Sequence, residues 1–157
     1  MITYTELVST DTYTAALRML ARRELSEAQI RQRLARRGES QESIDDAVVR
    51  LKSERSIDDE RVAGAIARTQ AAGRKRGRRR VLRQIEAAGI DKSIASRAVD
   101  QVFQDLDPDA LLSASLEKRL RGRDRIADDR EFQRLFRYLS AQGFDSDRIL
   151  AHLRRLQ

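Results

Sequence analysis

The chain has 157 residues, with 32 Lys and Arg against 25 Asp and Glu, no Cys, no Trp, one Pro and a single His. Without thiols and with only His152, it can build neither a disulfide, a zinc finger nor a cysteine nucleophile, because each of these needs Cys or several His. Seven aromatic residues are too few for the stacking platforms of sheet-based single-strand binders, so any nucleic-acid contact must depend on charge.

Helices are expected from near the beginning of the chain. After a tail at residues 1–11, the first helix is expected over about 12–23. Ser26 with Gln29 then has the form of a capping box, which marks the start of a second helix. Residues 44–51 carry apolar side chains at the helical spacing i, i+3, i+4, i+7, so a third helix follows.

Three glycines mark equivalent positions in an internal repeat of the sequence. Gly38, Gly89 and Gly143 each end a helical pattern, where a left-handed residue is favoured, and they are separated by 51 and 54 residues. Aliphatic residues lie four and eight positions before each glycine, and again ten and thirteen positions after it. Because this constant arrangement fixes both the loop length and the phase of the flanking helices, the sequence predicts a helical pair repeated three times.

A further helix precedes each of the later two pairs. These helices are expected over about 58–72 and about 108–121, the second one with Asp107 as its N-cap and Pro108 at its first position. The predicted fold is therefore all-α, an elongated array of three tandem three-helix repeats with about nine helices. The expected organisation is an N-terminal tail at 1–11, repeat 1 at 12–56, repeat 2 at 57–106 and repeat 3 at 107–157.

One segment carries the whole surplus of positive charge. Residues 74–83 hold seven cations and no anion, so the rest of the chain has 25 basic and 25 acidic residues. Phosphates are favoured over lipid as the partner, because no nearby amphipathic stretch carries the Trp or Phe that enters a bilayer interface. A solvated helix start that only keeps the protein soluble is the alternative. The candidate contacts are Arg74, Lys75, Arg76, Arg78, Arg79, Arg80 and Arg83.

A second basic cluster lies at the end of the helix expected over about 108–121. It is a weaker candidate for nucleic-acid or filament binding, because Glu117 and Asp124 dilute its charge. A solvated helix end explains it equally well. Its members are Lys118, Arg119, Arg121, Arg123 and Arg125.

We expect no catalytic residue, no metal site and no cofactor. The acidic clusters at 58–60 and 128–131 stand where helices begin, and the helix macrodipole favours anions there. Gly73 and Gly77 bracket three cations but lack the spacing and the Lys-Ser/Thr pair of a nucleotide-binding loop. Apolar runs are too short to span a bilayer, and the first residues do not read as a signal peptide, so we expect a soluble cytoplasmic protein without a membrane partner.

The three units resemble the RecX family, regulators of the RecA recombinase. The resemblance is carried by residues 16–38 in the first unit, by 57–63 and 77–90 in the second, and by 138–144 with 149–153 in the third. It covers about residues 12–156, which is nearly the whole chain. The middle unit is the most specific of the three.

This resemblance implies a non-enzymatic protein that binds the RecA filament on single-stranded DNA, with double-stranded DNA left open as a further ligand. It also implies that the protein lies in the helical groove of the filament, restrains filament growth, and lowers the ATPase, strand-exchange and co-protease activities of RecA. These activities belong to DNA repair, recombination and the SOS response. The expected oligomeric state is a monomer. Val62 departs from the family pattern, which has an aromatic residue, commonly Phe, at this position.

Two other functions fit the sequence. The protein could be an independent basic DNA-binding protein, either similar to a helix-turn-helix reader or without sequence preference, or a structural adaptor whose basic segment meets an acidic protein. Sequence-specific reading is disfavoured, because the third helix of the first unit exposes Glu42, Asp45 and Asp46, which phosphates would repel.

Overall fold

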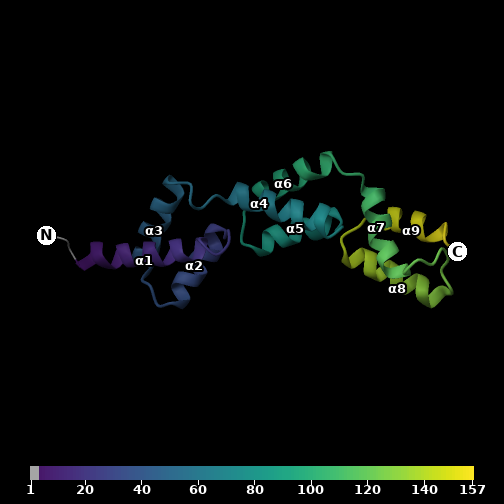
Figure 1. The fold of residues 1–157 in the computed structure, drawn as a ribbon, viewed down its shortest axis with the longest axis horizontal. Helices are drawn as coiled ribbons and strands as arrows, with labels where there is room; N and C mark the ends of the chain where they lie inside the picture. The colour runs from purple at the N-terminus through teal and green to yellow at the C-terminus, as the bar shows by residue number, and fades with distance from the viewer. Residues whose placement is uncertain (1–3) are drawn as a thin grey trace.

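The computed structural model describes the backbone of residues 4–157 and the side chains of residues 11–157. This part of the chain forms nine α-helices and one short π-helix and contains no strand, which confirms the all-α prediction. The helices form three successive triplets that follow one another along a single long axis (Figure 1). They are α1 (Tyr4–Leu20), α2 (Glu27–Arg36), α3 (Gln41–Ser53), α4 (Asp59–Arg68), the π-helix η1 (Thr69–Gly73), α5 (Arg78–Ala87), α6 (Lys92–Gln104), α7 (Pro108–Leu120), α8 (Asp129–Ala141) and α9 (Ser146–Arg154).

Capping residues account for several helix starts. The Ser26 hydroxyl accepts the backbone N–H of Gln29 at 3.2 Å, and the Gln29 side chain accepts the backbone N–H of Ser26 at 3.2 Å, so the predicted capping box is formed. Asp107 caps α7 by accepting the N–H of Asp109 at 2.9 Å, with Pro108 at the first helical position.

Left-handed glycines end the middle helix of each triplet. Gly38, Gly89 and Gly143 have φ values of +87°, +75° and +92°, which only glycine adopts without a steric penalty. Each glycine turns the chain from the middle helix of its triplet into the third helix. The structure therefore contains the repeated helix-glycine-helix pattern that the sequence predicts.

Helix α1 differs most from its expected bounds. It begins at Tyr4 and ends at Leu20, whereas the sequence placed this helix at about 12–23 after a tail at 1–11. Four Thr residues lie between positions 5 and 14, and β-branched residues lower the helix propensity of this stretch. The C-terminal half of α1 packs in the first triplet, where Ala15 and Ala16 are buried in the core.

Each triplet has an aliphatic core of its own. The residues that lie four and eight positions before each glycine are at most 4% exposed, as the repeat requires. Phe103 and Leu106 pack against the cores of both the second and the third triplet, so these two cores are joined. The most completely buried large side chains include Ile30, Leu34, Ile44 and Leu51 in the first triplet, Val81 and Ile85 in the second, and Leu112, Leu139, Ile149 and Leu153 in the third.

The middle helices α2, α5 and α8 follow one another along the long axis of the molecule (Figure 1). Between the first two triplets, the Ser26 hydroxyl at the start of α2 donates to the backbone carbonyl of Ala88 at the end of α5, at 2.5 Å. Gly89 lies so close to Ala28 that a Cβ on the glycine would overlap the alanine methyl. The positive end of one helix macrodipole therefore faces the negative end of the next, which is the favourable orientation.

Candidate nucleic-acid interface

The basic segment at residues 74–83 connects the π-helix to the beginning of α5. Arg74 to Arg76 form an irregular stretch in which Lys75 has a φ of +55°. Gly77 is the N-cap of α5 and has no side chain to cap the helix, so the first turn of α5 needs acceptors from elsewhere. Helix α5 then begins at Arg78.

The third triplet supplies those acceptors. The backbone N–H of Gly77 donates to the carbonyl of Gln142 at 2.9 Å, and the N–H of Arg79 donates to the carbonyl of Gly143 at 3.2 Å. The Arg80 guanidinium adds a hydrogen bond from Nη1 to the carbonyl of Ala141 at 3.2 Å. The start of the basic segment therefore sits against the C-terminal end of α8, and backbone atoms make the closest contacts.

The seven cations of the segment do not share one environment. Arg78 forms an ion pair with Asp100, and Arg79 lies 3.5 Å from a carboxylate oxygen of Asp145. Both side chains remain exposed, but a neighbouring anion already offsets part of their charge. These two residues are therefore the least available members of the predicted set.

The remaining cations have no acidic partner within the described part of the chain. Arg76 is half-buried and donates to the Gln70 side chain, and its pKa is lowered by burial and by the nearby charges of Arg80 and Arg74. Arg74 and Arg83 are exposed, and Lys75 is half-buried. A bound anion would relieve the mutual repulsion of these cations.

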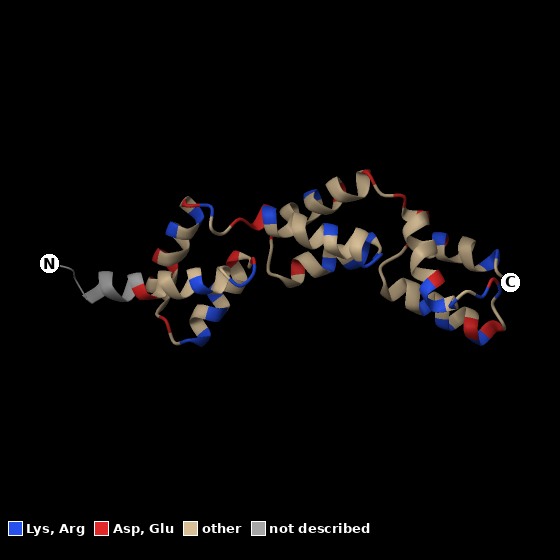
Figure 2. Ribbon diagram, in the orientation of Figure 1, with Lys and Arg blue, Asp and Glu red and all other residues tan. Residues whose placement is uncertain are grey.

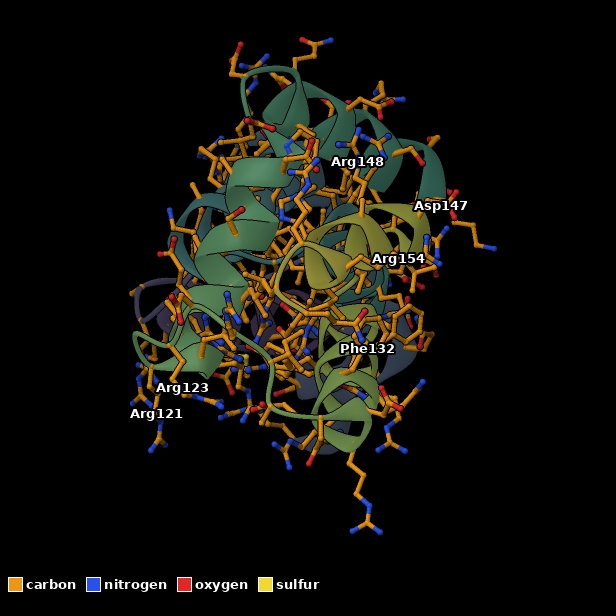
Figure 3. All side chains as sticks on the ribbon, turned by 90° about the vertical axis from the view of Figure 1, so that its right-hand side faces the viewer. Arg121, Arg123, Phe132, Asp147, Arg148 and Arg154 are labelled. Atoms are coloured by element: carbon orange, nitrogen blue, oxygen red, sulfur yellow. The ribbon has the colours of Figure 1, made fainter. Side chains whose placement is uncertain are left out.

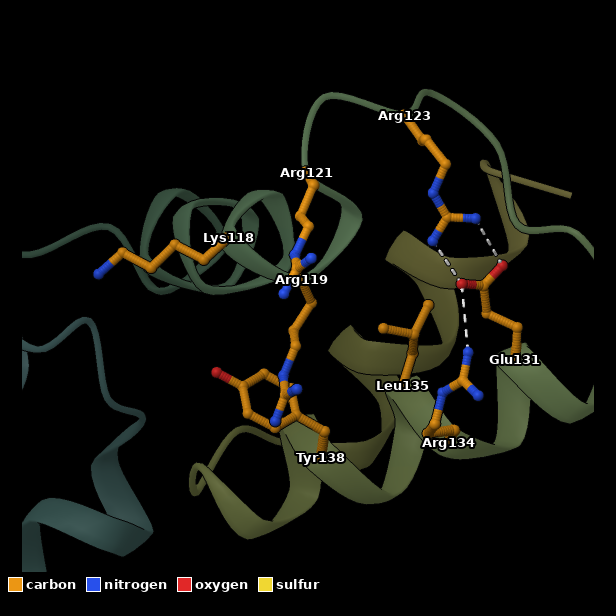
Figure 4. A pocket seen from close by; sticks show the side chains of 8 residues that line it. All are labelled: Lys118, Arg119, Arg121, Arg123, Glu131, Arg134, Leu135 and Tyr138. Carbon is orange, nitrogen blue, oxygen red and sulfur yellow. Dashed lines mark hydrogen bonds and ion pairs between the residues drawn. The ribbon is translucent and has the colours of Figure 1, made fainter.

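The second predicted cluster lines a cavity of about 660 Å³ between α7 and α8 (Figure 4). The guanidinium of Arg119 lies over the ring of Tyr138, 4.1 Å from its centroid. Arg125 is exposed but is not among the residues that line this cavity. Residues that line it are Lys118, Arg119, Arg121, Arg123, Glu131, Arg134, Leu135 and Tyr138.

Glu131 fixes the position of two of these arginines. Its carboxylate is 7% exposed and accepts hydrogen bonds from Arg123 at 3.1 and 2.5 Å, from Arg134 at 3.4 Å, and from the backbone N–H of Ala127 at 2.8 Å (Figure 4). The hydrogen bonds from Arg123 and Ala127 lower the pKa of Glu131 to about 2. The carboxylate is therefore ionised at neutral pH and orders Arg123 and Arg134 at the edge of the cavity.

The structure brings the two predicted clusters together across the junction of the second and third triplets. Tyr138 lies one helical turn before Gln142, whose carbonyl accepts the N–H of Gly77. The Arg80 guanidinium also reaches this end of α8, where it donates to the carbonyl of Ala141. The basic segment and the third-triplet cavity therefore form one cationic region.

A third basic cavity was not predicted. It has a volume of about 400 Å³ and lies between the end of α1 and α2 in the first triplet. Figure 2 shows that Lys and Arg are present in all three triplets. The sequence signal for it was a local excess of Arg, because residues 18–37 contain seven Arg and two acids. The lining residues are Ala15, Arg18, Met19, Arg22, Arg23, Arg33 and Arg37, with no acid among them.

The acidic clusters serve helix starts and ion pairs. Asp58 caps α4 by accepting the N–H of Arg61 at 3.0 Å, and Asp128 caps α8 by accepting the N–H of Glu131 at 2.7 Å. Among the residues whose side chains are described, no group of three or more His, Asp or Glu is arranged to hold a metal ion. No helix of the described chain is both long enough and apolar enough to cross a membrane.

Comparisons with known proteins agree on one family. A family model described as "RecX, first three-helix domain" matches residues 13–51. A Regulatory protein RecX of Syntrophotalea carbinolica is 34% identical over 138 residues, covering 87% of this chain and 90% of the relative. A Regulatory protein RecX of Halorhodospira halophila is 32% identical, with 87% of this chain and 83% of the relative covered.

Solved structures show the same fold. The crystal structure of RecX from Lactobacillus salivarius superimposes with a TM-score of 0.77 at 19% identity, covering 95% of this chain and 96% of the other. A second RecX crystal structure gives a TM-score of 0.75 at 20% identity, over 96% of this chain and 73% of the other. With a relative that is 34% identical along nearly its whole length, the chain belongs to the RecX family of regulatory proteins.

Proposed function

We propose that this protein is a non-enzymatic modulator of the RecA recombinase. It binds the RecA filament on single-stranded DNA and restrains filament growth and the ATPase, strand-exchange and co-protease activities of RecA. Membership of the RecX family supports this role, because its relatives are named regulatory proteins. The observation that carries the proposal is a cationic region on an elongated helical array, in which Arg74, Lys75 and Arg83 form no ion pair within the described structure.

The mechanism is occupancy of the filament. An elongated array can contact successive protomers of a polymer, and a local cationic region can approach the enclosed nucleic acid. Arg74, Lys75 and Arg83 are the first candidates for phosphate contacts, because no hydrogen bond or ion pair holds their side chains within the described structure. Action on a RecA filament places the protein in the cytoplasm.

Independent sequence-specific DNA binding has less support. A helix-turn-helix reader must place basic or amide side chains of one helix in the major groove. The third helix of the first triplet exposes Glu42 and Asp45, and in the second triplet Arg97 of α6 is engaged by Glu60 at 2.8 Å. Binding to DNA through the backbone phosphates is the more suitable mode.

The test compares the protein concentration that inhibits RecA with the concentration that binds naked DNA. Purified protein is added to RecA on single-stranded DNA while ATP hydrolysis is followed, and its affinity for naked DNA is measured in the same buffer. We expect inhibition at concentrations well below those that coat naked DNA. Equal concentrations would instead indicate simple competition for DNA, and no effect on RecA would refute the proposed function.

A charge-neutralising variant tests the residues. Replacing Arg74, Lys75 and Arg83 with Gln removes three phosphate contacts, each worth about −0.7 in the slope of log affinity against log salt. The slope for single-stranded DNA is expected to become less steep by about 2. An unchanged slope would show that these residues of the basic segment do not contact the DNA.

A further inference from the structure

The two junctions between triplets differ in the apolar contacts that cross them. Phe103 and Leu106 pack against the cores of both the second and the third triplet. Among residues whose side chains are described, no apolar residue packs against both the first and the second core, and Tyr13, Met19 and Leu20 border the first core alone. Domains joined by a small polar interface generally move against each other, whereas a shared apolar core resists such motion. The first junction is therefore the one expected to move.

The backbone between the first two triplets provides a narrow pivot. Ile57 is 4% exposed and belongs to the first core, while the next residue, Asp58, already caps α4 by accepting the N–H of Arg61. The backbone torsions of Ile57 and Asp58, on the segment that connects α3 to α4, can therefore absorb a rotation of the first triplet (Figure 1). At the second junction, Leu106 connects α6 to α7 and packs against both cores, so the connection there is anchored on both sides.

The Arg61 side chain crosses this pivot from α4. Its Nε donates to a carboxylate oxygen of Glu24 at 2.5 Å, in the loop between α1 and α2. Its two terminal nitrogens donate to the backbone carbonyls of Arg55 at 3.2 Å and of Ser56 at 3.5 Å, on the first-triplet side of Ile57. One guanidinium on α4 thus holds the first triplet through three contacts.

Two further hydrogen bonds close the junction at the start of α2. The Asp59 carboxylate on α4 accepts the backbone N–H of Glu27 at 2.9 Å, and the Ser26 hydroxyl donates to the carbonyl of Ala88. Opening the junction exchanges these hydrogen bonds for hydrogen bonds to water. The ion pair is the contact most open to competition from solvent, because the Arg61 side chain and its carboxylate partner are 42% and 47% exposed.

We propose that the first triplet turns as a body about the connection between Ile57 and Asp58, while the second and third triplets move together. Arg61 and Asp59, in the first turn of α4, form the latch that holds the closed arrangement. A few residues at the end of an element are sufficient for such a hinge. The inference goes beyond binding to a filament, because the hinge sets the angle between the first triplet and the rest of the array whatever the ligand.

The test measures distances across each junction in the full chain. The protein has no Cys, so spin labels attach only where Cys is introduced. One labelled pair replaces Gln32 on α2 and Gln101 on α6, and the other replaces Gln101 and Asp147, all of which are exposed. Asp147 lies at the edge of the third triplet in the view along the long axis (Figure 3). Double electron–electron resonance should give a wider distance distribution across the first junction than across the second, and equal widths would overturn the hinge.

A variant of the latch identifies what holds the junction closed. Replacing Arg61 with Gln should raise the ratio of open to closed molecules about two- to fivefold, the change expected for loss of an exposed ion pair. The matched control is Arg97→Gln, because Arg97 pairs with Glu60 of α4 at 2.8 Å but lies within the second triplet. Its distance distribution across the first junction should equal that of the wild type. Equal broadening by the two variants would show that loss of charge alone loosens the array and would overturn the latch.

Salt and the second labelled pair complete the test. Raising salt from about 0.1 M to about 1 M shortens the Debye length from about 10 Å to about 3 Å, so it should broaden the first distribution in the wild type. The same salt should change Arg61→Gln much less, and a wild type that does not respond would also overturn the latch. In every variant the distribution across the second junction should stay narrow, which shows that the fold is intact. Broadening there as well would mean that the whole array loosens and would overturn the hinge.

Discussion

Replacing Gly77 with Ala should separate the second and third triplets. A Cβ at this position would lie 2.6 Å from the backbone nitrogen of Phe144 and closer still to the carbonyl of Gly143. These obstacles are backbone atoms, so rotation of a side chain cannot relieve the overlap. The end of α8 must therefore move away from the start of α5.

The cost follows from the contacts that this movement breaks. The hydrogen bonds from Gly77 N–H to Gln142 and from Arg79 N–H to Gly143 would both lengthen or break. At about 1 kcal/mol for each hydrogen bond, the loss is about 2 kcal/mol, and packing strain adds to it. In an array of repeats this loss appears in the interface between neighbours rather than within a triplet.

The assay is urea unfolding followed by circular dichroism, with Gly73→Ala as the control. A Cβ on Gly73 would have no neighbouring atom within 4 Å, and this glycine has no positive φ, so its replacement should be neutral or stabilise by up to about 1 kcal/mol. Small-angle X-ray scattering should show a longer or more variable particle for Gly77→Ala alone. An unfolding free energy within about 0.5 kcal/mol of the wild type would refute the reasoning.

Other positions test the first junction and the buried carboxylate. Gly89→Ala should lower the unfolding free energy more than Gly38→Ala. Both substitutions strain a positive φ, by about 1–2 kcal/mol, but only Gly89 also contacts the neighbouring triplet. Equal losses of unfolding free energy in urea would contradict a role for that contact. Ser26→Ala should lower the unfolding free energy by about 1–2 kcal/mol, since it removes the cap of α2 and a donor to α5, and thermal melts can check this. Glu131, with a folded pKa of about 2 against 4.5 when unfolded, stabilises the fold fully above pH 4.5 and loses that contribution as pH falls toward 2. The Tm of Glu131→Gln should therefore fall less over this range than the wild-type Tm, and parallel curves would exclude the effect.

Periodicity and capping made most of the fold predictable. Gly38, Gly89 and Gly143 mark helix ends with little ambiguity, and the aliphatic residues at fixed distances from them define which face of each helix is buried. The start of α1 at Tyr4 was less predictable, because the four Thr residues between positions 5 and 14 lower the local helix propensity. Local signals thus determine the middle and third helices of each triplet better than α1.

The candidate site was predictable in composition but not in arrangement. The count of charges identified the segment at 74–83, yet the pairing of Arg78 with Asp100 and of Arg79 with Asp145 depends on residues distant in sequence. The hydrogen bond from Arg80 to the carbonyl of Ala141 likewise arises from the junction between triplets. The first-triplet cavity gave a weaker signal, because its arginines are spread over residues 18–37, on two helices and the loop between them, rather than gathered in one run.

Because the middle helices follow one another head to tail, the length of each middle helix sets the distance between neighbouring triplets. Helices α2 and α5 each have ten residues, so each advances the array by about 15 Å. Deleting one residue from the interior of α5 would shorten that step by about 1.5 Å and rotate everything beyond it by about 100°. Side chains of the hydrophobic core could repack locally, but the basic sites of adjacent triplets would no longer face the same side of the molecule. Selection on the spacing of binding sites would then act on the length of a helix as well as on the side chains that meet the ligand.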